Sequence, residues 1–80
     1  MTNLERLGNY IKTERENQNL TRNWLAKYTG ISRTEIINLE EGKRKQPSIK
    51  NLTSIAEALR LNKAHMVRMI DYIPYPGDEL

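Results

Sequence analysis

The stretch LTRNWLAKYTGISRTEIINLEEG, residues 20–42, predicts two short helices joined by a tight turn. Thr21 is a favourable N-cap for a first helix over residues 21–28, and Leu25 and Ala26 lie on the inner face of that helix. Gly30 supplies the positive φ that ends the helix, and Ile31 follows as the apolar residue of the turn. The chain then enters a second helix without a long connection.

The second helix is predicted over residues 32–40. Ser32 and Glu35 have the spacing of a capping box, Ile36 and Leu39 form the buried stripe, and Gly42 lies just beyond the end. Two short helices around a glycine-centred turn are typical of a DNA-reading helix-turn-helix, in which the second helix enters the major groove. The outward face of this helix carries Arg33, Thr34, Ile37, Asn38 and Glu41.

Three further helices are predicted on either side of this motif. Residues 3–17 repeat leucine and isoleucine at helical spacing, and the Pro-Ser pair at 47–48 begins a fourth helix that extends to residue 59. Asn62 caps a last helix, which the prolines at 74 and 76 prevent from continuing. The apolar stripes of these three helices are formed by Leu4, Leu7, Ile11, Ile49, Leu52, Ile55, Ala56, Leu59, Met66, Val67 and Ile70.

No alternating segment predicts a strand, so the expected class is all-α. The short connections favour a compact bundle of about five short helices with a central helix-turn-helix. We assign residues 1–71 to one domain and residues 72–80 to a C-terminal tail. Tyr10 and Tyr28 are expected at the rim of the core.

Composition narrows the possible functions. The 80 residues contain no cysteine and carry a formal net charge of +3, with basic residues gathered in and beside the two-helix motif. No apolar run approaches the ~18 residues of a membrane span, and no signal peptide is visible, so we expect a cytoplasmic protein without membrane contact. No catalytic or cofactor motif is present, and His65 has no second histidine or cysteine for a metal site. We predict neither an enzyme nor a cofactor or metal.

From Leu7 to Ile70 the sequence resembles the Cro/C1-type helix-turn-helix family, also called the XRE family, of phage repressors and bacterial regulators. The resemblance implies a lambda-repressor-like fold, a first motif helix on the DNA backbone, a second in the major groove, and a dimer on its operator. The matching features are Arg15, LTxxxLA at 20–26, TGIS at 29–32, IxNLExG at 36–42, PS at 47–48 and LxxIAxAL at 52–59.

Four residues of the second motif helix are candidate base contacts. Arg33 suits a guanine edge or a phosphate, and Asn38 suits an adenine edge or solvent. Thr34 suits either a base or a phosphate. Ile37 can pack on a thymine methyl or on neighbouring side chains.

Other positions are candidates for backbone contact and for assembly. Arg22 occupies a position where the family usually has a phosphate-contacting Gln, and the resemblance also implies an ion pair between Arg15 and Glu40. We expect Lys43, Arg44 and Lys45 to contact phosphates in a salt-sensitive way. The candidate dimer interface consists of Val67, Met69, Ile70, Tyr72, Ile73 and Tyr75.

These features favour a sequence-specific regulator of transcription, expected to be a repressor, that binds a near-palindromic double-stranded operator as a homodimer. The alternative is an antitoxin or adaptor that uses the same fold to bind a protein, through Trp24, Ile37 and the aromatic tail. A third interpretation makes these residues the N-terminal module of a longer regulator.

Overall fold

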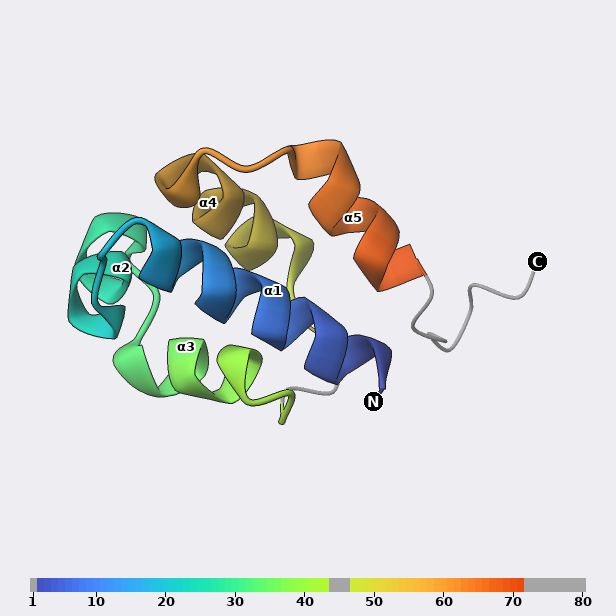
Figure 1. Ribbon diagram of the computed structural model, residues 1–80, viewed down its shortest axis with the longest axis horizontal. Helices are drawn as coiled ribbons and strands as arrows, with labels where there is room; N and C mark the ends of the chain where they lie inside the picture. The colour runs from blue at the N-terminus through green and yellow to red at the C-terminus, as the bar shows by residue number, and fades with distance from the viewer. Residues whose placement is uncertain (1, 44–46, 72–80) are drawn as a thin grey trace.

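The computed structural model describes residues 2–43 and 47–71, which form an all-α bundle (Figure 1). Helix α1 crosses the middle of the bundle and packs against α3 on one side and against α4 and α5 on the other. Helix α2 bridges α3 and α4 at one end. The predicted fold class is therefore confirmed. The helices are α1 (Asn3–Asn17), α2 (Arg22–Thr29), α3 (Arg33–Glu40), α4 (Ile49–Leu59) and α5 (Lys63–Asp71).

Side-chain caps define the helix starts that the sequence predicts. The Thr21 and Ser32 hydroxyls accept hydrogen bonds from the backbone N–H three residues later, at 3.0 and 3.1 Å. Asn62 Oδ1 caps α5 in the same way at 3.0 Å. A full capping box at the start of α1, between Thr2 and Glu5, was not predicted. The Thr2 backbone N–H donates to the Glu5 carboxylate, which lowers the pKa of Glu5.

Three helices end in the same left-handed turn, at Asn19, Gly42 and Arg60. In each case the next residue donates a backbone hydrogen bond to a carbonyl five residues back, as in the Schellman motif. Helix α2 ends at Gly30, with φ of 78° and a single hydrogen bond to the Ala26 carbonyl. Arg60 bears a side chain at a φ of 58°, a conformation that costs an L-residue free energy.

The core lies between α1, α4 and the inner faces of the other three helices. Among the described side chains of the predicted stripes, Leu4 is partly buried and Ile49 is 60% exposed, because Ile49 occupies the first position of α4. The others are buried: Leu7, Ile11, Leu52, Ile55, Ala56, Leu59 and Met66. Tyr28 is also not at the core rim, since it is 66% exposed. Tyr10 is half-buried and packs on the core. Fully buried large side chains are Leu7, Ile11, Leu25, Ile36, Leu52, Ile55, Leu59 and Met66.

The crossing of α1 over the end of α3 depends on Gly8. A Cβ atom at this position would lie 2.2 Å from the Leu39 carbonyl oxygen and 2.6 Å from that of Glu40. Only glycine allows the two backbones to approach so closely. This contact fixes the position of the predicted reading helix relative to α1.

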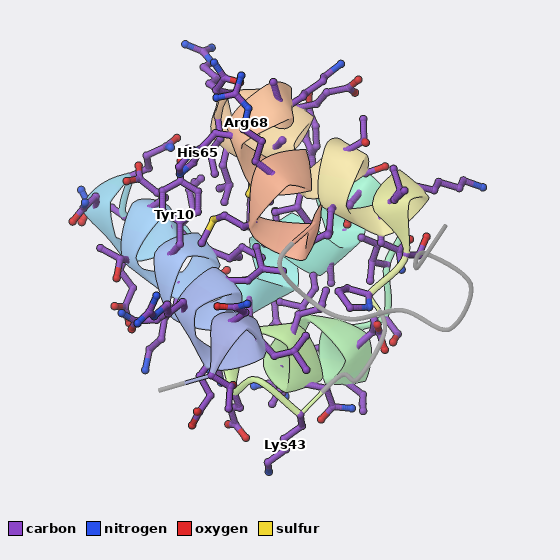
Figure 2. All side chains as sticks on the ribbon, turned by 90° about the vertical axis from the view of Figure 1, so that its right-hand side faces the viewer. Tyr10, Lys43, His65 and Arg68 are labelled. Carbon is purple, nitrogen blue, oxygen red and sulfur yellow. The ribbon has the colours of Figure 1, made fainter. Side chains whose placement is uncertain are left out.

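Helix α5 closes the bundle against α1 and α4. Met66 is buried, Met69 is half-buried against the core, and His65 meets the ring of Tyr10 edge-on at a centroid distance of 5.2 Å (Figure 2). The side chains of Val67 and Ile70, and all of Tyr72, Ile73 and Tyr75, lie outside the described residues, so the predicted interface stays a prediction. No described helix is both long and apolar enough to cross a membrane.

Candidate nucleic-acid interface

Helix α3 presents a mostly polar face to solvent, opposite the buried side chains of Ile36 and Leu39. Its N-cap at Ser32 fixes the start of the helix, so the residues that follow have defined positions on its surface. Arg33 and Thr34 are exposed, whereas Ile37 and Asn38 are half-buried. All four candidate base contacts therefore have surface available to a partner.

A buried carboxylate, that of Glu40, joins the end of α3 to two other helices. Arg15 Nε donates to Glu40 Oε2 at 2.7 Å, and Arg15 Nη2 donates to Oε1 at 3.0 Å. Arg22 Nε donates to the same Oε1 at 2.8 Å. The Glu40 side chain has no exposed surface, while those of Arg15 and Arg22 are 8% and 25% exposed.

The two arginines differ in what else holds them. Arg15 Nη1 also donates to the Leu20 carbonyl at 2.7 Å, so three of its nitrogens have partners. The hydrogen bond to Glu40 is the main cause of the raised pKa of Arg15. Arg22 uses Nε for Glu40, and its two Nη nitrogens carry further N–H donors.

Arg22 also lies at the edge of a hollow of about 410 Å³ between the end of α1, the start of α2 and the start of α3. Its cationic lining comes from all three helices. Glu16 is the acidic residue in that lining. The full lining is Lys12, Arg15, Glu16, Leu20, Thr21, Arg22, Asn23 and Arg33.

The basic segment after α3 is described as far as Lys43. This side chain extends away from the bundle below α3 (Figure 2), and its ammonium lies 2.9 Å from the Glu41 carboxylate. Both side chains are well exposed, at 67% and 41%, so solvent screens the pair and it contributes little to stability. The hydrogen bond from Lys43 lowers the pKa of Glu41. Arg44 and Lys45 lie outside the described residues.

An exposed aromatic pair occupies another part of the surface. The Trp24 and Tyr28 rings stack at a centroid distance of 5.0 Å, and both remain partly open to solvent. They line a second hollow together with residues of α4 and of the α1–α2 connection: Gln18, Leu20, Glu57, Ala58 and Arg60. Residues of α3 do not line this hollow, so Trp24 and Ile37 do not share it.

Comparison with known proteins identifies the family to which this architecture belongs. A family profile described as helix-turn-helix matches residues 11–65, which run from α1 into the first turn of α5. The chain belongs to the Cro/C1-type helix-turn-helix family. It is also similar to the HTH-type transcriptional repressor RghR of Bacillus subtilis (strain 168), with 34% identity over 70 residues. These cover 88% of this chain and 52% of that protein, so the chain spans about half the length of this relative.

Membership makes this Cro/C1-type chain part of a family of DNA-binding transcription regulators. Two features of the candidate interface were not predicted from the sequence. Glu40 was expected to pair with Arg15 alone, although Arg22 binds the same carboxylate. No role was predicted for Lys12, which lies three residues before Arg15 and so on the same face of α1. Among the described residues, no group of acidic or histidine side chains could hold a metal ion.

Proposed function

We propose that this chain is a sequence-specific, double-stranded-DNA-binding repressor of transcription that acts in the cytoplasm and reads DNA with α3. The observation that carries the proposal is the capped helix α3, which has an exposed face with hydrogen-bond donors. Its Glu40 carboxylate fixes it to Arg15 of α1 and Arg22 of α2. The similarity to a transcriptional repressor supports repression rather than activation.

The proposed base contacts are Arg33, Thr34, Ile37 and Asn38. Arg33 lies in the first turn of α3, which reaches deepest into the major groove in helix-turn-helix complexes, and its guanidinium matches O6 and N7 of guanine. Arg33→Ala should cost roughly 1–3 kcal/mol on the operator and relax selectivity at one base pair. An equal loss on operator and random DNA would instead assign Arg33 to a phosphate.

The proposed phosphate contacts are Arg22, Lys43, Arg44 and Lys45. Lys43 supports this assignment because it extends from the end of α3, and the pair that it makes with Glu41 is exposed enough to exchange for a phosphate. Neutralising Lys43, Arg44 and Lys45 together should weaken binding to all sequences alike. The slope of log affinity against log salt should fall by about 0.9 for each phosphate that the variant no longer neutralises.

The chain is proposed to bind a near-palindromic operator as a homodimer through α5 and the tail. A single module of this size contacts few base pairs, so two copies about one helical turn apart are needed for the affinities typical of regulators. Sedimentation of the full chain and of a version ending at Asp71, each with and without operator, tests this directly. A monomer on DNA, or pairing that survives the truncation, would contradict it.

Selection of bound sites from a random pool of duplexes is the experiment that tests the proposed function. The expected result is an enriched site with two inverted half-sites whose centres are about 10 base pairs apart. A pool that shows no enrichment after repeated rounds would contradict sequence-specific recognition.

One observation favours the second candidate, an antitoxin or adaptor role. The stacked pair Trp24 and Tyr28 is an exposed aromatic surface of the kind that binds proteins. Replacing Tyr28 by Ser should leave operator affinity unchanged under the leading proposal. A loss of cellular function with full retention of DNA binding would support the second candidate.

A further inference from the structure

We propose that the hollow between α1, α2 and α3 binds one phosphodiester of the DNA backbone, and that Lys12 contacts this phosphate together with Arg22. The inference rests on the proposed function and adds to it a contact from α1. It follows from the charge of the hollow, the position of Lys12 and the way Arg22 is held.

The hollow is cationic because its lining holds four basic side chains and one acidic side chain. Lys12, Arg15, Arg22 and Arg33 line it, against Glu16 alone. Glu40, behind Arg15 and Arg22, accepts three N–H groups through its two oxygens. Its charge is thus shared between two arginines and is not available to neutralise the other cations. An anion entering the hollow meets a net positive surface.

Lys12 is exposed and forms no ion pair with another described residue. It lies on the side of α1 that faces the candidate interface, since it lines the hollow beside Arg22 and Arg33. Its charge also reaches the end of α3. The pKa of Glu41 is lowered mainly by Lys43 but also by the charges of Arg22 and Lys12.

Arg22 is held in place before any ligand arrives. Its bond from Nε to Glu40 orients the guanidinium, and a quarter of its side chain remains exposed. A planar guanidinium fixed through Nε offers its Nη donors in a defined direction, whereas the lysine ammonium acts as a compact charge that needs no particular orientation. This combination suits a phosphodiester, which carries one charge on two oxygens.

Two matched substitutions test the site. Lys12→Gln removes the proposed contact, and Lys27→Gln is the control, because Lys27 is an exposed lysine in the last turn of α2 that does not line the hollow. Both variants lose one positive charge and should fold like the unmodified chain. Binding to random duplexes and to the selected operator is measured between 50 and 200 mM salt.

Lys12→Gln should flatten the salt dependence on both DNAs by up to about 0.9, the value for one phosphate, because Arg22 still contacts that phosphate in the variant. The fourfold rise in salt should therefore cost the unmodified chain up to about 3.5-fold more affinity than it costs the variant. Lys27→Gln should retain the original slope. A Lys12→Gln slope equal to that of the control would overturn the site. So would a loss confined to the operator, because a phosphate contact is independent of sequence.

Uncharged methylphosphonates, placed one at a time in the operator, locate the contact. One position should weaken binding of the unmodified chain and of Lys27→Gln more than binding of Lys12→Gln, which has only the Arg22 contact left to lose there. Equal effects on all three proteins at every position would overturn the assignment. If the unmodified chain binds its operator but the effects of Lys12→Gln are absent, only the proposed phosphate site is wrong. If the unmodified chain prefers no duplex, the proposed function is wrong as well.

Discussion

Replacing Glu40 by Ala should be among the most damaging single changes in this protein. The carboxylate is fully buried and accepts three N–H groups from Arg15 and Arg22, so its removal leaves two guanidinium groups without their counter-charge. Arg22 is a quarter exposed and can turn toward water, but Arg15 is held among buried groups. Breaking a buried pair on one side costs about 3–5 kcal/mol. A domain of this size has only about 4–12 kcal/mol of stability in total.

Urea denaturation followed by helical circular dichroism measures this loss. The midpoint should fall by about 2 M or more. Glu57→Ala is the control, because its pair with Lys63 is more than half exposed on both sides and should contribute less than about 1 kcal/mol. A Glu40→Ala variant no less stable than Glu57→Ala would refute the reasoning.

A second variant covers the case in which Glu40→Ala does not fold. The double variant Arg15→Met, Glu40→Met removes both partners of the Arg15–Glu40 ion pair and replaces them with apolar side chains of similar length. It should recover at least half of the lost stability, since no charge is left stranded on α1. A double variant as unstable as Glu40→Ala would show that the stranded charge of Arg15 is not the cause.

Three further outcomes are expected from denaturation experiments on single variants. Gly8→Ala should cost about 3 kcal/mol or more, because the new methyl would overlap the Leu39 carbonyl. Gly30→Ala has open space around it and should cost only about 1–2 kcal/mol for its left-handed φ. Equal losses in the two variants would contradict the close crossing of α1 and α3. Arg60→Gly should raise the free energy of unfolding by about 0.5–1 kcal/mol, the relief of its positive φ less the added chain entropy, and a decrease would contradict this. The folded-state pKa of Glu5 is below its usual value of 4.5, so Glu5→Gln should be less stable than the unmodified chain above pH 4.5. The difference in stability should shrink as the pH falls below 4.5. A difference that does not change with pH would show that the ionised Glu5 carboxylate is not its source.

The sequence is sufficient to predict the five helices because local chemistry decides where they begin and end. The caps at Thr21, Ser32 and Asn62 act within three residues, and Gly30 ends α2 through its own backbone conformation. Periodicity likewise identifies most of the core. It fails at Ile49, where the apolar residue lies in the first turn of α4 and faces solvent.

The candidate site is less predictable, because it depends on contacts between residues far apart in the chain. The resemblance implied contact between Arg15 and Glu40, which lie 25 residues apart, but Arg22 was assigned only to phosphate and not also to the same carboxylate. The role of Gly8 arises from the approach of two helix backbones, which no local pattern reports. Lys12 gains its place in the hollow for the same reason, since α1 passes beside the starts of α2 and α3.

The measurement that tests the central claim most directly compares the affinity of the full chain for its selected operator with its affinity for a scrambled duplex of equal length, at one fixed salt concentration. If α3 reads base edges in the major groove, the operator should be preferred by at least about 10³-fold. Equal affinities for the two duplexes would contradict the account, because the chain would then recognise only the charge and shape of the DNA backbone.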